Sequence, residues 1–498
     1  MNVNPITRLD YPDPDVIRVE DTYYMVSTTM HFMPGCEILQ SFDLVHWEHV
    51  TYVYETLDHT DAQQLKSGQN IYGQGMWAAS LRYHEGRFCI CFVANDTRKT
   101  YLYTSEKIDG PWKKQLIEGF YHDGSLLFDE DGRNYIVYGN DEIWITELNE
   151  DLTAPKKDGL HRLLVSDHKN PELGYEGSHI QKINGYYYIF LIHSLRDRWM
   201  RTEACFYSDS LEGEFTGGDV LCDDRGYCGQ GVAQGGIVDT PDGKWYAMLF
   251  QDSGAVGRIP ILLPVTWKDH FPFFGQNGHV PEEIEVHSTR PGYIYQPLVG
   301  SDDFCNGLLP RWQFNHDPDP QYYHLDALQG TYTITTREVC TELTQAVNTL
   351  TQRMSYPSCA AEVTVDASAL KEGDVAGLCA LQGCYAAVGI TKHHGKYEVL
   401  MLDKKEDGIL DMTEGTVVES HQMDFRLEAD FCNMKDEARC YYRVNKGDWL
   451  PIGTVHKLYF KLDHFTGCRF GLFCYAAEET GGSACFRDFK YYDVDEIS

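Results

Sequence analysis

The N-terminal part of the chain, residues 1–295, repeats one pattern of polar and apolar positions. Each unit has a leading residue, an apolar strand, a turn with Gly or Asp, and a second strand rich in aromatic residues. The five units read DPDVIRVEDTYYMV from Asp13, WAASLRYHEGRFCICF from Trp77, DGSLLFDEDGRNYIVYG from Asp123, EGSHIQKINGYYYIFL from Glu176 and QGGIVDTPDGKWYAML from Gln234. They begin roughly fifty to sixty residues apart, the length of one four-stranded propeller blade, and helical periodicity is nearly absent. The pattern predicts an all-β domain with five propeller blades.

The pattern changes near residue 295. After the turn-rich stretch RPGYIYQPLVGSDDF come short alternating segments such as TYTITTR, CAAEVTVDAS and KLYFKLDHF, separated by Gly, Asp and Lys turns. Short alternating strands with frequent turns are typical of an antiparallel sandwich. We therefore expect a β-sandwich over residues 300–498, following the propeller over residues 1–295.

The leading positions of the five units predict a functional site. In a propeller the innermost strand of each blade runs beside the central axis, so equivalent positions point into one shared funnel. Three of the leading residues are carboxylates, which are costly to bury without partners. Pro12 and Pro14 bias their neighbours toward extended backbone, so we expect Asp13 to be held stiffly at the start of its strand. The leading residues are Asp13, Trp77, Asp123, Glu176 and Gln234.

Charge and length narrow the class of protein. The chain has 498 residues and a formal net charge of −33, from 75 Asp and Glu against 42 Lys and Arg. Two domains, at most three, fit this length. Nucleic acid and anionic membranes would repel such a charge, whereas a neutral small oligosaccharide is compatible, as is a homo-oligomer.

The ends and the cysteines bear on location. The start MNVNPITRLD lacks a signal-peptide pattern, and no run of about eighteen apolar residues follows, so we expect a cytoplasmic protein. Of the 16 cysteines, Cys89 and Cys91 lie in the strand-like FCICF. No CxxC spacing indicates zinc, and we interpret most as reduced core residues rather than disulfides.

Converging carboxylates suit hydrolysis of a glycosidic bond. Two carboxyl groups about 6.5–9.5 Å apart support inversion, in which one activates water and the other protonates the leaving oxygen, while about 5 Å allows a retaining route. A third carboxylate nearby raises the pKa of the acid. The alternative use is a Ca²⁺ or Mg²⁺ site, but calcium ligands usually come from one short loop, and these acids lie on three distant units.

The N-terminal motifs resemble glycoside hydrolase family 43, the β-xylosidases and α-L-arabinofuranosidases. The stretches NPITRLDYPDPDVIRV, MWAASLRYHEGRF, HDGSLLFDEDGRNYIVYG and YEGSHIQKINGYYYIF follow in the family's order. The resemblance covers residues 1–295 and implies that Asp13 is the general base, Glu176 the general acid, and Asp123 the residue that tunes and orients that acid. Asp15 is interpreted as a turn or strand-start acid.

The resemblance also implies substrate-binding residues. Arg258 corresponds to an arginine that hydrogen-bonds sugar hydroxyls, with a surface or salt-bridged arginine as the alternative. Trp77 and the stretch MHFMPG, with Met30 and Phe32, correspond to the apolar wall of the innermost sugar subsite; core packing is the alternative for each. His122 and His179 flank the candidates and are interpreted as structural.

Two features depart from the family pattern or extend it. Gln234 stands where many members have a histidine that supports a central ion, so an axial Ca²⁺ is in doubt, no cofactor is required, and no metal ligands are assigned. The stretches DDFCNGLLPRWQFNHDPD and GDVAGLCALQGCYAAVGI resemble the concanavalin-A-like (jelly-roll) domain that follows the propeller in many members. Such a domain either narrows the catalytic pocket, which we favour, or binds sugar itself.

These observations predict an exo-acting β-1,4-xylosidase that releases xylose from xylo-oligosaccharides by inversion. An α-L-arabinofuranosidase, or an enzyme with both activities, is the alternative. An invertase-type hydrolase also joins these two folds, but its NDPNG-like motif is absent. A non-catalytic carbohydrate-binding propeller is the remaining alternative, and it would have been favoured by loss of one of the three acids.

Overall fold

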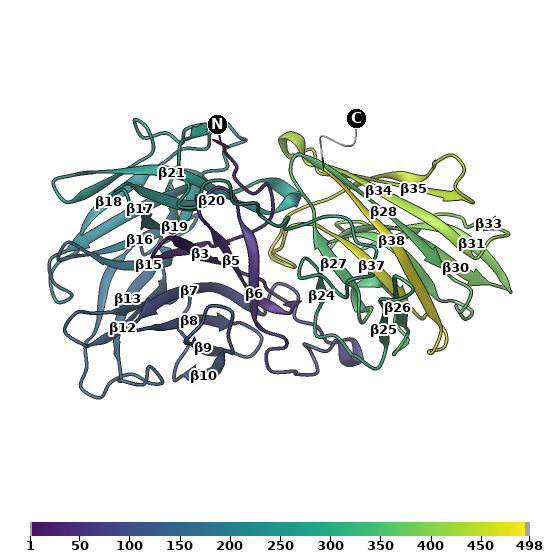
Figure 1. Cartoon of the computed structure of the whole chain (residues 1–498), viewed down its shortest axis with the longest axis horizontal. Helices are drawn as coiled ribbons and strands as arrows, with labels where there is room; N and C mark the ends of the chain where they lie inside the picture. Colours follow the sequence, from purple (N-terminus) through teal and green to yellow (C-terminus); the bar gives the residue numbers. More distant parts are fainter. Residues whose placement is uncertain (1, 494–498) are drawn as a thin grey trace.

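Two β-rich bodies lie side by side in the computed structural model, which describes residues 2–493 (Figure 1). Five four-stranded antiparallel sheets form the body coloured purple to teal, and two larger sheets form the green to yellow body. The predicted fold class, a five-bladed propeller followed by a β-sandwich, is confirmed.

Each propeller sheet is one blade, with its first strand innermost. Blade 1 contains β2 (Asp15–Val19), β3 (Thr22–Val26), β5 (Gly35–Ser41) and β6 (Glu48–Tyr54), and blade 2 contains β7 (Met76–His84), β8 (Arg87–Ala94), β9 (Lys99–Ser105) and β10 (Lys113–Ile117). Blade 3 contains β11 (Ser125–Phe128), β12 (Asn134–Asn140), β13 (Glu142–Leu148) and β14 (His161–Ser166), and blade 4 contains β15 (Glu176–Ile183), β16 (Tyr186–Ser194), β17 (Arg201–Ser208) and β18 (Thr216–Leu221). Blade 5 contains β19 (Val232–Asp239), β20 (Trp245–Asp252), β21 (Arg258–Lys268) and β22 (Phe271–Phe274).

Alternation along the strands explains how the blades pack. In the stretch FCICF of β8, Phe88, Ile90 and Phe92 belong to the apolar cluster shared with blade 1, whereas Cys89 and Cys91 belong to the cluster shared with blade 3. Successive side chains of a strand point to opposite faces, so a strand that is apolar throughout fits a sheet covered on both faces. Each interface between blades has an apolar cluster of this kind.

The N-terminus closes the propeller ring. Strand β1 (Asn2–Val3) pairs with β23 (Glu283–Ile284), which follows blade 5. The side chain of Asn4 donates to the Leu262 carbonyl at 2.8 Å and accepts from the Leu262 N–H at 3.0 Å. The ends of the propeller are thus tied by backbone pairing and a buried amide.

Two sheets form the sandwich. The first contains β32 (Leu410–Met412), β31 (Lys396–Lys404), β30 (Tyr385–His393), β29 (Val375–Leu381), β37 (Arg469–Tyr475), β27 (Leu350–Arg353), β24 (Gln313–Asn315) and β4 (Phe32–Met33), with β33 (Thr416–Val418) beside β31. The second contains β25 (Tyr323–Asp326), β26 (Thr331–Thr335), β38 (Ser483–Asp493), β28 (Ser358–Asp366), β34 (Gln422–Asp430), β35 (Glu437–Val444) and β36 (Leu450–Lys457). Short 3-10 helices occur at η1 (Lys66–Gly68), η2 (Gly254–Val256), η3 (Leu343–Gln345) and η4 (Cys432–Met434).

Strand β4 joins the two bodies, because it leaves blade 1 and pairs with β24 of the sandwich. Beside it, the Arg469 guanidinium lies 3.4 Å from the centre of the Phe32 ring. Arg353 of the sandwich forms a buried ion pair with Glu37 of blade 1 at 2.9 Å. The interface therefore contains a shared sheet and charged contacts that water does not reach.

The cysteines were expected to be mostly reduced residues of the core. Ten of the 16 cysteines are buried, and none forms a disulfide within residues 2–493. No helix in the described part of the chain is long and apolar enough to cross a membrane.

Candidate active site

Hydrogen bonds between neighbouring blades define which positions of the inner strands are equivalent. The N–H groups of Leu81, Leu126 and Ile180 donate to side-chain oxygens of the preceding blade, at 2.7, 3.1 and 3.0 Å. The acceptors are Asp15, Ser80 and Ser125, respectively. These bonds align the inner strands residue by residue.

This alignment corrects one detail of the predicted repeat. Asp13 and Asp123 are equivalent, each two residues before its acceptor, but Glu176 lies one residue earlier, at the position of Trp77 and His122. A register shift occurs at this point in β7, β15 and β19 alike, so it does not by itself mark the offset of Glu176. The prediction that three carboxylates share one repeat position is therefore wrong for Glu176.

The backbone bends sharply at the shared position. Asp13 has φ 54°, Asp123 has φ 48°, Gln234 has φ 59° and Gly177, their equivalent in blade 4, has φ 64°. Left-handed backbone costs a non-glycine residue roughly 1–2 kcal/mol, and such strain concentrates at functional sites. Asp13 is thus not extended as the flanking prolines predict, because the Pro12 carbonyl is held by Ser27 Oγ at 2.6 Å.

The Asp13 carboxylate is buried and held by two side chains. Thr28 Oγ1 donates to Oδ2 at 2.5 Å, and Arg258 Nη1 lies 3.0 and 3.2 Å from the two oxygens. The Phe465 ring of the sandwich covers the Arg258 guanidinium at 4.1 Å. Arg258, predicted to contact sugar hydroxyls, is placed so that it orients Asp13.

Asp123, His122 and Glu176 form a cluster whose polar atoms lie within 4.8 Å of one another. His122 Nε2 lies 3.5 Å from Asp123 and 3.7 Å from Glu176, and Asn140 Nδ2 donates to Glu176 at 2.6 Å. The neighbouring Asp123 carboxylate, with Glu176 and Asp13, raises the pKa of His122 to about 9 against the effect of burial. Burial, with Glu176 and Asp13, raises the pKa of Asp123 to about 6.

The raised pKa of His122 predicts a pH-dependent contribution to stability. A histidine that binds its proton more tightly when folded contributes stability fully below its ordinary pKa of about 6.5, and loses that contribution as pH rises through the folded pKa of about 9. We expect the unfolding free energy of the natural protein, relative to His122→Gln, to fall by about 1–3 kcal/mol between pH 6.5 and 9.5. Urea unfolding at the two pH values measures this difference.

The His122 charge lowers the pKa of Asp123, so Asp123 titrates at a higher pH in His122→Gln, and the measured stability difference contains this change as well. His287→Gln is the matched control, because His287 is 68% exposed. A constant difference between the natural protein and His122→Gln across the window would contradict the predicted charge on His122.

Glu176 opens into a cavity of about 690 Å³ that is lined by both domains. Trp77, His122 and Glu176 line it from the propeller, and residues 460–462 with Phe465 line it from the sandwich. The Trp77 ring lies 5.6 Å from the Phe465 ring, and its Nε1 is buried without a hydrogen-bond partner among the described residues. The structure thus identifies the sandwich loop that covers the pocket.

Met30 and Phe32 do not line this cavity. Met30 exchanges backbone hydrogen bonds with Met76 at 3.0 and 3.1 Å, which fixes it in the wall between blades 1 and 2. Phe32 belongs to β4 and packs against Arg469 in the domain interface. Their placement does not support the predicted contacts with sugar.

Asp15 belongs to a buried network on the propeller axis. Its oxygens accept from Leu81 N–H at 2.7 Å and from Arg82 Nη1 at 2.7 Å, and contact His179 Nδ1 at 3.1 Å. His179 is therefore structural, as the sequence predicts. Gln234, on the same axis, packs its side chain against Gly177.

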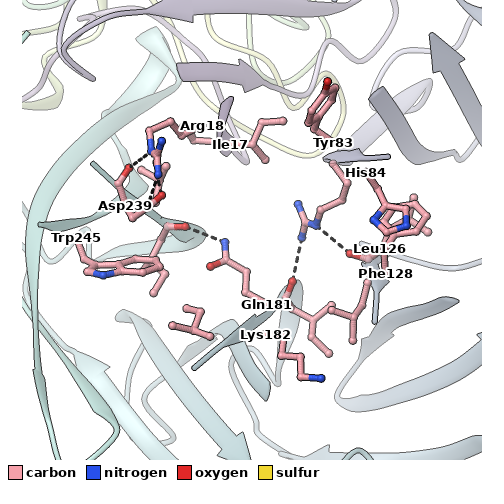
Figure 2. A pocket seen from close by; sticks show the side chains of 17 residues that line it. Ile17, Arg18, Tyr83, His84, Leu126, Phe128, Gln181, Lys182, Asp239 and Trp245 are labelled. Atoms are coloured by element: carbon pink, nitrogen blue, oxygen red, sulfur yellow. Dashed lines mark hydrogen bonds and ion pairs between the residues drawn. The ribbon is translucent and has the colours of Figure 1, made fainter. Parts of the chain in front are cut away.

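The opposite mouth of the axial channel is a second cavity, of about 410 Å³ (Figure 2). Arg82 projects into it and is held by the carbonyls of Leu126 at 2.9 Å and Ile180 at 3.2 Å. Nearby, Gln181 donates to the Ile237 carbonyl and Arg18 pairs with Asp239. Arg82 with Asp15 thus separates this mouth from the acids, so the active cavity is a pocket rather than a tunnel.

Four residues of the site were not predicted from the sequence to be functional. They are His122, Asn140, Thr28 and Phe465. His122 precedes Asp123 directly, so its neighbourhood was visible, but its orientation toward Glu176 depends on the offset register. Phe465 lies far from the propeller in sequence, and no pattern connects the two.

Comparisons with known proteins agree with this arrangement. A β-xylosidase of Formosa agariphila is 26% identical over 99% of this chain and 89% of its own length. A xylosidase/arabinosidase of Butyrivibrio fibrisolvens is 23% identical over 99% of both chains. A structure described as a bifunctional GH43-CE protein of Bacteroides eggerthii has a TM-score of 0.92 and 42% identity over 99% of this chain, which spans 63% of that protein.

Family assignment follows from both halves of the chain. Residues 301–492 match the β-xylosidase C-terminal concanavalin-A-like domain, which confirms the predicted type of sandwich. Residues 3–272, more than half of the chain, match the glycosyl hydrolases family 43 model. With Asp13, Asp123 and Glu176 brought near one another by the propeller, this match shows that the chain belongs to glycosyl hydrolase family 43.

Proposed function

We propose that this chain is an exo-acting β-1,4-xylosidase that releases xylose from the ends of xylo-oligosaccharides. The observation that carries the proposal is the pocket closed on one side by the sandwich loop and on the axis by the Asp15–Arg82 pair. A pocket with one opening accepts the end of a chain rather than its middle. The names of the relatives, β-xylosidase and xylosidase/arabinosidase, support the same substrate class.

The proposed mechanism is a single displacement with inversion. Asp13, oriented by Thr28 and Arg258, removes a proton from the water that attacks the anomeric carbon. Glu176 protonates the leaving oxygen, and Asn140 fixes its orientation. Asp123 and the His122 imidazolium set the electrostatic surroundings of that acid.

The proposed mechanism requires no cofactor. On the axis, both Asp15 oxygens are engaged by Leu81, Arg82 and His179, and Gln234 replaces the expected histidine. These contacts support acid-base chemistry by side chains alone.

An α-L-arabinofuranosidase is the second candidate, because relatives carry both activities in their names. Initial rates on 4-nitrophenyl β-D-xylopyranoside and 4-nitrophenyl α-L-arabinofuranoside separate the two. Proton NMR of the first product distinguishes mechanisms: we expect α-xylose from the β-xyloside. Initial release of β-xylose would contradict inversion, and no turnover of either substrate would contradict the proposed function.

Gly467→Ala is expected to lower kcat/KM about 10- to 100-fold by displacing the sandwich loop. The Gly467 N–H donates to Asp10 Oδ2 at 2.8 Å, and Asp10 Oδ1 accepts from the Arg258 N–H at 2.7 Å. A methyl group on Gly467 would lie 2.2 Å from the Val256 carbonyl oxygen and 2.7 Å from Asp10 Cβ. We expect these close approaches to displace the backbone at residue 467, and with it both Phe465 and Arg258. Kinetics on an aryl xyloside measure the resulting change in kcat/KM.

Gly218→Ala is the control for this substitution, since a methyl group there meets no atom within 4 Å. Its kinetics are expected to match those of the natural protein. Unchanged kinetics for Gly467→Ala would show that the loop does not position the pocket.

A further inference from the structure

Three histidines lie together where the two domains meet, and one of them belongs to the loop that covers the pocket. His31 comes from the propeller, between β3 and β4, whereas His316 follows β24 and His464 lies in the loop between β36 and β37. The His31 ring lies 4.9 Å from the His316 ring and 5.8 Å from the His464 ring. Tyr72 of the propeller stacks on His464, with the ring centres 3.9 Å apart and the planes 16° from parallel. The proposed mechanism uses none of these four side chains.

The three imidazoles are neutral in the folded protein. His31 and His316 have no exposed surface, and His464 is 7% exposed. Neither ring nitrogen of His31 has a hydrogen-bond partner among residues 2–493, and His316 Nε2 accepts from the Ile71 N–H at 3.0 Å. Burial, and after it the neighbouring imidazoles, hold the pKa of His31 and His316 well below the ordinary value. Burial also lowers the pKa of His464 to about 4.

The surroundings of the cluster do not balance an added positive charge. Arg469 acts on His31, and Lys404 acts on His464, which raises the cost of a proton on either ring. The opposing acid is Asp463, whose carboxylate already accepts from the Tyr459 hydroxyl and the His464 N–H. The other titratable groups near the cluster are paired or uncharged: Glu342 with Lys404, Asp317 with His59, and the buried Tyr72 and Cys379. A proton on the cluster is therefore a buried charge without a free partner.

The cluster contacts the loop at the point that matters for the site. His464 directly precedes Phe465, whose ring lies 4.1 Å from the guanidinium of Arg258, the residue that orients Asp13. The propeller segment beside Tyr72 packs as closely, because a methyl group on Gly73 would lie 2.4 Å from the Leu462 carbonyl oxygen. Residues 458–468 belong to no strand. Side-chain contacts rather than strand pairing thus set the position of Phe465.

We propose that His464, held by Tyr72, His31 and His316, positions Phe465 over Arg258, and that protonation of these imidazoles opens the loop in acid. An imidazole in the open loop has the ordinary pKa of about 6.5. Closure is therefore favoured fully above pH 6.5, and it weakens as the pH falls toward the folded pKa of about 4. Each imidazole that becomes accessible raises the equilibrium constant for opening roughly 20-fold between pH 7 and pH 5.

Hydrogen exchange of the whole protein, followed by mass spectrometry on peptides from residues 458–468, measures opening without any turnover. In the closed loop the N–H groups of Phe465 and Cys468 donate to the carbonyls of Lys461 and Ala255, both at 2.8 Å. After correction for the intrinsic effect of pH on exchange, the opening constant is expected to rise at least about 20-fold from pH 7 to pH 5. The rise is expected to be about 20-fold smaller in His464→Phe, whose ring still stacks but does not titrate.

His316→Gln is the second variant if His464→Phe fails to fold, since the glutamine oxygen can accept from the Ile71 N–H in place of His316 Nε2. It is expected to reduce the rise in the same way. An equal rise in the natural protein and the folded variants, or no rise in the natural protein, would overturn the acid-driven opening.

Kinetics on an aryl xyloside test the positioning role. His464→Ala removes the stack and is expected to lower kcat/KM about 10-fold at pH 7, whereas His464→Phe is expected to stay within about 2-fold of the natural protein. The ratio of kcat/KM between His464→Phe and the natural protein cancels the titration of Asp13 and Glu176. This ratio is expected to rise as the pH falls from 7 to 5, and full activity of His464→Ala would refute the positioning role.

His46→Ala is the matched control, because the His46 ring also stacks on a tyrosine, 5.6 Å from Tyr295, but its side chain is 56% exposed and lies outside the cavity. It is expected to change neither the exchange nor the kinetics. The kinetic measurement rests on the proposed function, whereas the exchange measurement does not. Absence of turnover in the natural protein would therefore contradict the proposed function, while exchange still decides whether the histidines hold the loop.

Discussion

Asp13→Asn is expected to lower kcat about 10²- to 10⁴-fold, the usual contribution of a positioned general base. The amide oxygen of asparagine still accepts hydrogen bonds from Thr28 and Arg258, which hold the natural carboxylate. The substitution therefore removes the proton acceptor while it keeps the local contacts. Turnover of 4-nitrophenyl β-D-xylopyranoside, with circular dichroism to verify folding, measures the effect.

Leaving-group dependence distinguishes Asp13 from Glu176. Glu176→Ala is expected to retain much more activity on 2,4-dinitrophenyl than on 4-nitrophenyl xyloside, because the better leaving group departs without a proton. Asp13→Asn is expected to slow both substrates alike. Retention of more than about a tenth of natural turnover by Asp13→Asn would refute its role as the base.

Asp15→Asn is expected to lower the unfolding free energy by about 3–5 kcal/mol, the cost of breaking a buried ion pair. Burial opposes ionisation of Asp15, but Arg82, His179 and the Leu81 N–H together lower its pKa below the ordinary value. The neutral amide leaves the charged Arg82, 12% exposed, without its partner. Urea denaturation at pH 7 measures the loss.

Asp13 and Asp15 are only two residues apart, so Asp13→Asn and Asp15→Asn can be compared directly. The folded fraction of Asp15→Asn is expected to retain turnover within about tenfold of the natural protein, because Asp15 lies on the axis behind the reacting groups. Asp21→Asn, which breaks an exposed pair with Arg290, is expected to cost less than about 1 kcal/mol. Equal stability of the Asp15 and Asp21 variants would remove Asp15 from the buried network.

The propeller was predictable because each blade has a local pattern of polar and apolar residues that repeats along the sequence. Strands that are apolar on both faces, such as β8, and turns between aromatic strands are visible without any tertiary information. The convergence of Asp13, Asp123 and Glu176 followed from that repeat. What the pattern could not resolve was a single-residue offset, because a polar residue precedes the inner strand in blades 1, 3 and 4 whichever of two neighbouring positions it occupies.

Contacts between distant segments account for the remaining differences. Phe465 reaches Trp77 only because the sandwich packs on the propeller, and Phe32 was drawn into that interface by pairing between β4 and β24. Similarly, the extended backbone expected at Asp13 yields to the tertiary bonds that hold Pro12 and the carboxylate. The positions of these residues depend on which surfaces of the two domains pack together, and the periodicity of the sequence does not indicate that.

The pairing of β4 with β24 has a consequence for synthesis on the ribosome. Met33 emerges early, but its strand partner Phe314 is made only after the entire propeller. At roughly 5–20 residues per second, the interval is about 15–60 s. During that time the apolar loop of blade 1 has an unpaired edge, so the nascent chain presents a binding site for chaperones until the first strand of the sandwich covers it.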